Sequence, residues 1–383
     1  MYKRELSAYL INSFDKYPAI SITGPRQSGK TTVAKETFPN LDYVNLEDPS
    51  VRMVVQNDPK GFLDNYNNGL IIDEVQNIPE IFSYLQVYID QKDAPRQYIL
   101  TGSQQFLLNE KISQSLAGRV ALFNLLPLSY REIGSAETDI CKLMLRGFYP
   151  RLYRYDIASR DFYPSYIQTY IERDIRMLSN ITDLSLFQKF IYLCAGRVGQ
   201  ILNLSSLAND CGISNATAGK WLSLLESSYI CYTLKPYFSN INKRVIKSPK
   251  LYFYDTGLLC SLLNIDDSIQ LQNHYAVGGI FENYILMEMK KFYSNHNMKD
   301  QLYYLRNKNG QEIDVLIDQG DKKILVEIKF GKTFSENYLK NIEYWTEILG
   351  NTENILIYTG DVDSYKYKNT TIYNWKNFYP ILS

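Results

Sequence analysis

An eight-residue stretch near the start of the chain has the spacing of a phosphate-binding loop. Residues 24–31 read GPRQSGKT and match the pattern G-x-x-x-x-G-K-[ST] in full. Its glycines let backbone N–H groups turn inward around phosphates, and the start of the next helix adds its positive dipole end. We expect Lys30 to reach the β- and γ-phosphates and Thr31 to place its hydroxyl on Mg²⁺. The residues predicted to bind nucleotide are Gly24, Pro25, Arg26, Gln27, Ser28, Gly29, Lys30, Thr31 and Thr32.

Two later apolar stretches end in polar residues that suit the same chemistry. Residues 70–72 form a predicted strand that ends in Asp73 and Glu74. Asp73 is suited to hold Mg²⁺ through water, and Glu74 to polarise the attacking water. The strand-like QYILTGSQ ends in Ser103 and Gln104, which we expect beside the γ-phosphate. Together these residues predict ATP and Mg²⁺ as cofactors.

The order of these elements resembles that of an AAA+ ATPase. The resemblance implies that Ser103 is the sensor-1 polar residue of that family. It also implies that Arg119, which follows a predicted helix, acts as an arginine finger on a neighbouring subunit's nucleotide, with Arg119 bound only to a helix dipole as the alternative. Such a finger accelerates phosphoryl transfer roughly 10³- to 10⁵-fold, and its action in trans requires a homo-oligomer.

Residues 205–237 have the pattern of two short helices joined by a glycine turn, followed by a strand. With a second strand-like segment at 247–255, this pattern predicts a winged helix. One interpretation is duplex DNA binding, with the second helix in the major groove. The other is a packing module or a lid on the ATPase, since Lys220 is the only basic residue of the second helix. The predicted wing carries a basic cluster of Lys243, Arg244, Lys247 and Lys250.

Ionisable residues interrupt two apolar strands in the last third of the chain. Asp314 lies in EIDVLID, and Glu327 and Lys329 lie in KILVEIKF, where alternation places both on one face. Buried charges need partners or a metal, so Asp314 and Glu327 are candidates to share a divalent cation. Glu282, on a preceding predicted helix, is placed to complete the acidic set, and Lys329 to hold the attacking water or a phosphate. This is the chemistry of metal-assisted phosphodiester cleavage.

The three residues Asp314, Glu327 and Lys329 resemble the motif of PD-(D/E)xK nucleases, although Ile313 replaces the motif's proline. The alternative is an inactive nuclease-like fold that is kept for binding or packing. Over its whole length the chain resembles a large prokaryotic family that couples an AAA+ core to a C-terminal domain of unknown function. The segment YIERDI, residues 170–175, is similar to the junction of that family.

The composition and net charge of the chain bear on whether it binds nucleic acid or membranes. The 41 basic and 41 acidic residues give a net charge of zero, so no global attraction to nucleic acid or to anionic membranes is expected. No apolar run is long enough for a membrane span, and the start of the chain lacks the features of a signal peptide. With five scattered cysteines, these features predict a cytoplasmic protein.

We therefore predict an α/β protein that begins with a P-loop AAA+ core, a parallel sheet flanked by helices. The predicted function is ATP binding and hydrolysis coupled to action on DNA. The alternative is a nucleotide-switched module that binds a protein partner and has an inactive nuclease-like fold. The predicted parts are the AAA+ core (1–135), a helical connector (136–185), the winged helix (186–260) and an α/β restriction-endonuclease-like domain (261–383).

Overall fold

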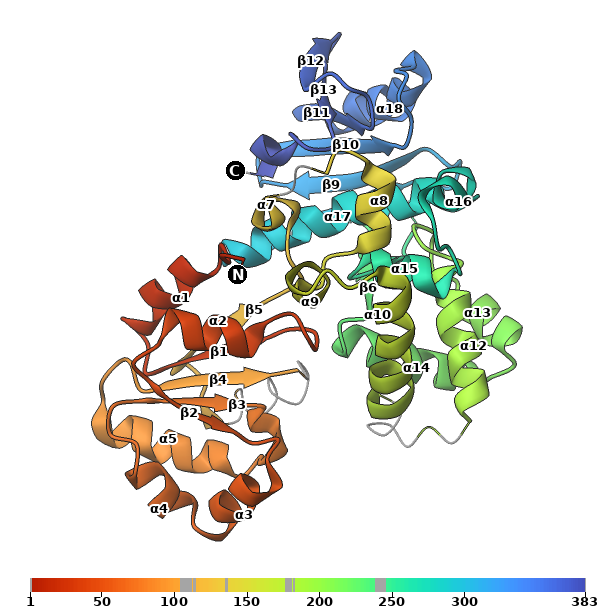
Figure 1. The fold of residues 1–383 in the computed structure, drawn as a ribbon. Helices are drawn as coiled ribbons and strands as arrows, with labels where there is room; N and C mark the ends of the chain where they lie inside the picture. The colour runs from red at the N-terminus through yellow and green to blue at the C-terminus, as the bar shows by residue number, and fades with distance from the viewer. Residues whose placement is uncertain are drawn as a thin grey trace.

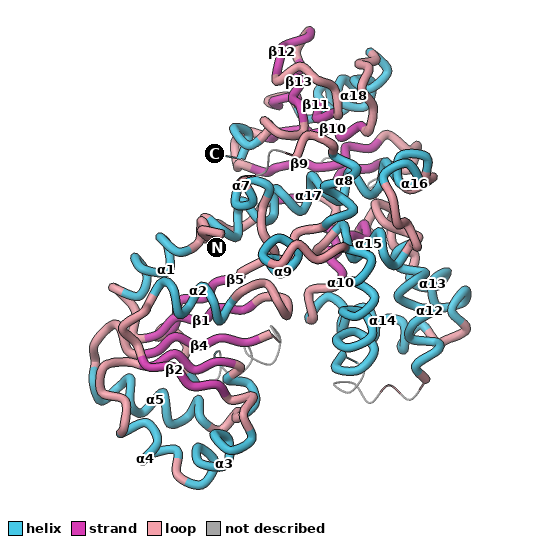
Figure 2. The backbone as a smooth tube through the Cα atoms, in the orientation of Figure 1, coloured by secondary structure: helices cyan, strands magenta, loops and turns pink. Residues whose placement is uncertain are grey.

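Two large β-sheets, one near each end of the sequence, are separated by a mainly helical part (Figure 1). Figure 2 shows the strands of these sheets as two groups, with helices between and around them. The computed structural model describes residues 2–103, 112, 115–134, 137–175, 181, 183–237 and 246–382.

The N-terminal sheet has five parallel strands in the order β2-β3-β4-β1-β5. Its central strands are apolar and buried, as expected for a parallel sheet between two layers of helices. Ile20 and Ile22 of β1 pack with α1 and α2, whereas Leu70 and Ile72 of β3 pack with α5. The strands are β1 (Ala19–Thr23), β2 (Asp42–Asn45), β3 (Leu70–Asp73), β4 (Tyr98–Gly102) and β5 (Val120–Asn124). The helices are α1 (Ser7–Phe14), α2 (Lys30–Thr37), α3 (Pro49–Asn57), α4 (Pro59–Asp64) and α5 (Ile81–Lys92).

A series of short helices leads from this sheet into the middle of the chain. The first of them, α7, begins with a capping box in which Ser129 and Glu132 each bond the other's backbone N–H. The predicted helix around Tyr166 and Tyr170 is present, and both side chains are buried. The helices are α7 (Tyr130–Ile133), α8 (Ile140–Arg146), α9 (Pro150–Arg154), α10 (Ser159–Tyr166) and the π-helical η2 (Ile167–Ile175).

The middle part contains the predicted pair of helices joined by a glycine turn. Gly212 has φ of 83° at the end of α13, and the Ser214 hydroxyl caps α14 by accepting a hydrogen bond from Thr217 N–H. Two short antiparallel strands follow. The elements are α12 (Leu184–Ala195), α13 (Leu204–Cys211), α14 (Asn215–Ser227), β6 (Cys231–Leu234) and β7 (Lys250–Phe253).

The C-terminal sheet has six strands in the order β12-β13-β11-β10-β9-β8. The strands β8, β9 and β10 are antiparallel neighbours, and β11 joins β10 in parallel. Val315 and Val326 belong to the core that includes α17, whereas Leu316 and Leu325 pack with α18. The strands are β8 (Leu302–Arg306), β9 (Glu312–Asp318), β10 (Lys323–Lys329), β11 (Thr352–Tyr358), β12 (Ser364–Tyr367) and β13 (Thr370–Asn374). The helices before and within this part are α15 (Thr256–Leu262), α16 (Ser268–Asn273), α17 (Val277–Asn295) and α18 (Lys340–Leu349).

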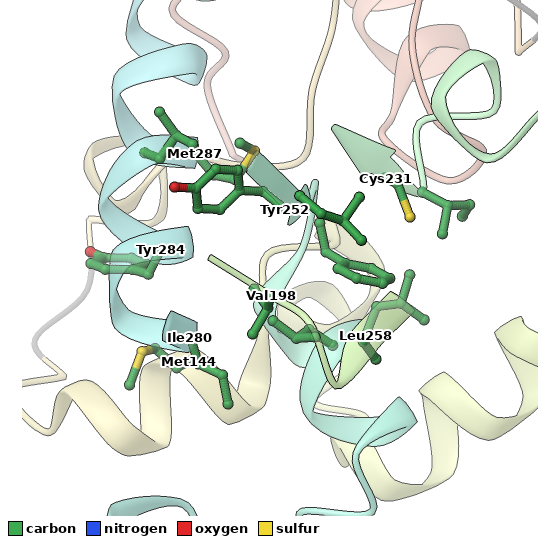
Figure 3. Packing of buried hydrophobic residues seen from close by; sticks show 14 of the residues in the cluster. Met144, Val198, Cys231, Tyr252, Leu258, Ile280, Tyr284 and Met287 are labelled. Atoms are coloured by element: carbon green, nitrogen blue, oxygen red, sulfur yellow. The ribbon is translucent and has the colours of Figure 1, made fainter. Parts of the chain in front are cut away.

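One apolar core joins the middle of the chain to the C-terminal sheet. It extends from Ile140 on α8 to Leu382 near the end of the described chain. Figure 3 shows part of it, where Tyr252 of β7 lies beside Met287 of α17, with Cys231 of β6 on the opposite side of Tyr252 from this helix. The middle elements and the C-terminal sheet are therefore packed against each other and share this core.

The predicted α/β class is confirmed, with a parallel sheet flanked by helices and a second sheet at the C-terminal end. The domain boundaries at residues 135, 185 and 260 stay predictions. Among the helices in the described ranges, none combines the length and the apolar character that a membrane crossing requires.

Candidate functional site

The phosphate-binding loop connects β1 to α2, as the sequence predicts. Gly24 has φ of 151°, and a Cβ atom there would lie 2.2 Å from the carbonyl oxygen of Leu125, so a side chain does not fit. Gln27 and Gly29 also have positive φ, 63° and 94°. These values fold the loop tightly over the start of α2, an arrangement in which backbone N–H groups are available to bind an anion.

Lys30 lies inside this loop. Its Nζ donates hydrogen bonds to the carbonyl oxygens of Gly24 (3.0 Å) and Pro25 (2.9 Å). Burial lowers the pKa of Lys30, and the nearby carboxylates of Glu74 and Asp73 oppose this shift. The loop carbonyls therefore hold the ammonium in the pocket that the glycines create.

Asp73, at the end of β3, is surrounded by hydroxyl groups. Thr31 Oγ1 and the Tyr43 hydroxyl each donate to Asp73 Oδ2 over 2.8 Å, and Thr101 donates to Oδ1. Burial raises the pKa of Tyr43, and the Asp73 carboxylate raises it further, so the phenol stays protonated. The pairing of Asp73 with Thr31 was predicted. Tyr43 was not, because no motif marks a tyrosine on the neighbouring strand β2.

Glu74 and Ser103, which were both predicted near the γ-phosphate end of the nucleotide, are in direct contact. Glu74 Oε2 accepts hydrogen bonds from Ser103 Oγ (2.9 Å), from Ser103 N–H (3.2 Å) and from the Gln76 side-chain amide. Glu74 has φ of 53°, a left-handed backbone conformation that only a few per cent of non-glycine residues adopt. Gln104, predicted beside Ser103, lies outside the described residues.

A cavity of about 1020 Å³ opens over the loop, at the upper end of the range for small-molecule sites. One wall is the loop with Thr31 and Glu74, and the other is formed by residues of α9, α10 and η2. The Arg26 guanidinium lies 5.1 Å from the ring centre of Tyr170 across the cavity. The residues that the connector contributes are Pro150, Arg151, Tyr153, Arg154, Tyr155, Tyr166, Thr169 and Tyr170.

The end of α14 also contacts the nucleotide-binding sheet. The Tyr229 hydroxyl donates to Asn124 Oδ1 (2.9 Å) and lies 3.1 Å from Thr23 Oγ1, next to the loop. The Tyr170 hydroxyl donates to the carbonyl oxygen of Ser228 (3.3 Å). The helix–turn–helix part is thus attached both to the end of β1 and to the cavity wall.

Arg119 lies at the other end of the sheet. Its carbonyl oxygen accepts a hydrogen bond from Ala19 N–H, at the start of β1, whereas the loop follows the end of β1. Its guanidinium makes two bonds to Asp90 on α5, of 2.6 and 2.9 Å. Arg119 is therefore not part of its own chain's nucleotide site. Its predicted action on a neighbouring subunit stays a prediction.

The structure brings Asp314, Glu327 and Lys329 together, as predicted. Lys329 Nζ lies 2.7 Å from Glu327 Oε1 and 3.5 Å from Asp314 Oδ2. Asp314 lies at a bulge, because the pairing moves from Tyr303–Leu316 to Leu305–Ile313 and leaves one extra residue in β9.

The prediction that Lys250 is an exposed wing residue was wrong. Lys250 begins β7 and is 1% exposed. Its Nζ lies 2.7 Å from Glu282 Oε1, 2.6 Å from Glu312 Oε1 and 4.0 Å from Asp314 Oδ1. All four residues of β7 are buried, so neither face of this strand offers Lys250 to solvent. Of the other predicted wing residues, Lys247 is exposed, while Lys243 and Arg244 lie outside the described residues.

We call Lys250, Glu282, Glu312, Asp314, Glu327 and Lys329 the C-terminal ion-pair cluster. Burial, opposed by Lys250, raises the pKa of Glu282 to about 7. Burial and the neighbouring Asp314 raise the pKa of Glu327 to about 8. The predicted cation shared by Glu282, Asp314 and Glu327 does not fit this geometry well, because an ammonium group lies within 4.0 Å of at least one oxygen of each carboxylate, although Glu327 Oε2 is buried without a hydrogen-bond partner. No group of three or more His, Cys, Asp or Glu side chains suited to a metal ion occurs within the described ranges.

Comparison with known proteins places these sites in a family. Residues 16–134 match the family described as "AAA domain". Residues 137–269 and 277–378 match two domains of unknown function, DUF8612 and DUF4143. The uncharacterized proteins Rv2008c of Mycobacterium tuberculosis and Mb2031c of Mycobacterium bovis are each 32% identical over 334 residues, which cover 85% of this chain and 74% of theirs. The chain belongs to the family of these mycobacterial proteins.

This chain therefore has an AAA-type ATPase core followed by two parts of unknown function. An uncharacterized protein of Haemophilus influenzae is 24% identical over 275 residues, which cover 62% of this chain and 67% of that protein. Among solved structures, the Walker-type ATPase paby2304 of Pyrococcus abyssi aligns over 69% of this chain and 96% of its own, with 12% identity and a TM-score of 0.38.

Proposed function

We propose that this protein binds ATP with Mg²⁺ in the cavity over residues 24–32, hydrolyses it, and uses the nucleotide state to control its middle and C-terminal parts. The observation that carries the proposal is that Lys30 and Thr31, at the start of α2, line one cavity with Glu74, which follows β3, while Asp73 at the end of β3 accepts a hydrogen bond from Thr31. Lys30 supplies positive charge to the phosphates, and the loop supplies N–H groups.

The residues present fit a magnesium ion. Thr31 Oγ1 and Asp73 Oδ2 are 2.8 Å apart, and hydroxyl and carboxylate oxygens are the donors that Mg²⁺ takes from proteins. Bound there with ATP, the ion supplies charge neutralisation to the phosphates. Tyr43 and Thr101 hold the Asp73 carboxylate in a fixed orientation through their own hydrogen bonds.

Glu74 is the proposed general base. It lines the cavity, and Ser103 holds one of its carboxylate oxygens, which restricts rotation of the side chain. A base that is held in one orientation removes the proton of an attacking water more efficiently. Ser103 is accordingly a positioning residue for Glu74.

Two contacts support transmission from the loop to the helix–turn–helix part. Arg26 in the loop contacts Tyr170, which bonds Ser228 at the end of α14. Thr23, one residue before the loop, contacts Tyr229. A change in loop conformation on binding or hydrolysis alters both contacts, and therefore the position of α14.

We propose DNA as the target of this movement. The support is the order α13, turn, α14, β6 and β7, which is that of a winged helix, and the order α17, β8, β9, β10, α18 and β11, which is that of a PD-(D/E)xK fold. The alternative target is a protein partner. It is favoured by the neutralisation of Asp314 and Glu327 by lysine side chains and by the burial of Lys250.

ATP turnover of matched variants tests the first step. Lys30→Ala is expected to lose nucleotide binding, while Glu74→Gln keeps binding and loses turnover about 10²- to 10⁴-fold. Lys60→Ala and Glu80→Gln, at exposed positions, are the controls and should retain the wild-type rate. Wild-type turnover in Glu74→Gln would refute the proposed mechanism.

DNA binding measured over a range of salt concentrations separates the two targets. Contacts to phosphates make the affinity fall steeply as salt rises, and turnover should increase when DNA is added. If no DNA binding is detected at low salt, the DNA proposal fails and the protein-binding alternative stands.

We also propose a homo-oligomer in which Arg119 acts on the neighbour's nucleotide. The support is the family resemblance and the exposed position of the Arg119–Asp90 pair on the sheet end away from the loop. Arg119→Ala and Glu74→Gln subunits, each inactive alone, should regain turnover when mixed. Arg96→Ala, which breaks the exposed pair with Asp15, is the control. A wild-type rate for Arg119→Ala would exclude the finger.

A further inference from the structure

We propose that the Lys250 ammonium is the resident cation of the C-terminal ion-pair cluster and excludes divalent metal ions from it. Lys250 belongs to β7 in the middle of the chain, whereas its carboxylate partners belong to α17 and β9 of the C-terminal part. The inference concerns this cluster alone and does not depend on ATP turnover.

Lys250 is buried where only compensated charge is stable. Its side chain is 2% exposed, and its Nζ lies within 2.7 Å of carboxylate oxygens of both Glu282 and Glu312. An ammonium removed from water costs several kcal/mol unless carboxylates surround it. Glu282 is fixed from a second side, because it also accepts a hydrogen bond from the Tyr252 hydroxyl. The position of Lys250 is therefore fixed by its two carboxylate partners, one of which is itself held by Tyr252.

Asp314 is the residue that both lysines share. Its Oδ1 lies 4.0 Å from Lys250 Nζ, and its Oδ2 lies 3.5 Å from Lys329 Nζ. Oδ2 also accepts a hydrogen bond from Ile328 N–H (2.8 Å). A divalent ion needs several oxygens at about 2.0–2.6 Å. Such an ion would have to displace at least one ammonium group before it could reach Asp314.

The charge of the cluster leads to the same conclusion. Four carboxylates face three cationic groups once Arg306, 2.7 Å from Glu312, is included. With every group ionised, one negative charge is in excess, and a divalent ion added to this set would reverse its sign. Removal of Lys250 raises the excess to two negative charges, which equals the charge of one divalent ion. Lys250 therefore neutralises one of the two negative charges that would otherwise match a divalent ion.

As long as β7 packs against the C-terminal part, the cluster therefore does not bind the metal ion that phosphodiester cleavage requires. The same ammonium ties the middle of the chain to the C-terminal sheet, so that entry of a metal and release of β7 are mutually dependent. The cluster acts as a metal-independent connection between the two parts.

Manganese binding in the absence of nucleotide tests the inference. It is measured by electron paramagnetic resonance and by thermal unfolding. An Asp73→Asn background removes the metal site of the N-terminal sheet. The otherwise unchanged chain should show the same unfolding temperature in EDTA and in millimolar Mn²⁺. Lys250→Ala should unfold at a lower temperature in EDTA and recover part of the loss in Mn²⁺. Adding Asp314→Asn to Lys250→Ala should abolish that recovery.

Two results would overturn the inference. The first is that the chain with Lys250 intact binds Mn²⁺ and loses this binding in Asp314→Asn. This measurement does not depend on the folding of any Lys250 variant. The second is that Lys250→Gln or Lys250→Ala folds but does not gain Mn²⁺ binding that depends on Asp314. Lys250→Arg retains the charge and should remain insensitive to Mn²⁺, which controls for the loss of packing.

Discussion

The nucleotide site and the C-terminal ion-pair cluster use the same residue types in opposite ways. Each places carboxylates at strand positions within reach of a buried lysine. In the nucleotide site, Lys30 bonds loop carbonyls, and Asp73 receives its hydrogen bonds from hydroxyl groups. In the cluster, Lys250 and Lys329 bond the carboxylates directly.

The difference shows that the partners of a carboxylate decide what it can bind. A hydroxyl group orients a carboxylate without neutralising it, so Asp73 keeps its full charge for a metal ion. An ammonium group both orients and neutralises, so Asp314 and Glu282 have little charge left to offer. Acidic residues at nuclease-like spacing therefore do not suffice to predict a metal site.

The largest expected effect comes from removing the cation of the cluster. Lys250→Ala leaves buried carboxylates uncompensated and should lower the free energy of unfolding by about 3–5 kcal/mol. Lys247→Ala, an exposed lysine three residues earlier, should change it by less than about 0.5 kcal/mol. Denaturant unfolding of both variants measures the difference. Equal stability of the two would mean that Lys250 contributes no more than a surface lysine.

A smaller effect is expected from the hydroxyl groups around Asp73. Tyr43→Phe removes one hydrogen bond to a charged group, an interaction worth about 1.5–3 kcal/mol. Because Tyr43 orients Asp73, the concentration of Mg²⁺ needed for half-maximal turnover should rise while ATP binding without metal is unchanged. Tyr84→Phe, at an exposed position, is the control. An unchanged Mg²⁺ requirement in Tyr43→Phe would remove Tyr43 from the site and weaken the contrast between hydroxyl and ammonium partners.

Sequence reasoning succeeded where the signal is local. The loop around Lys30 and the pair Asp73–Glu74 follow from motifs within single segments, and strand alternation placed Glu327 beside Lys329. It failed for Lys250, whose partners Glu282 and Glu312 are 32 and 62 residues away. Nothing within β7 indicates that the side chain of its first residue points toward carboxylates of α17 and β9, because the packing of segments that are distant in sequence determines this direction.

The smallest predicted effect concerns the contact between the N-terminal sheet and the helix–turn–helix part. Tyr229→Phe removes the hydrogen bond to Asn124 and the contact with Thr23, and should lower the free energy of unfolding by about 0.5–1.5 kcal/mol. Its effect on basal ATP turnover should be slight, because Tyr229 does not line the cavity. Stimulation of turnover by DNA, or by a protein partner, should be lost, whereas Tyr192→Phe on the surface of α12 should retain it. If Tyr229→Phe retained full stimulation, the nucleotide site would have to communicate with the rest of the chain through other contacts, such as those of Arg26 with Tyr170 and of Asn124 with Ser294.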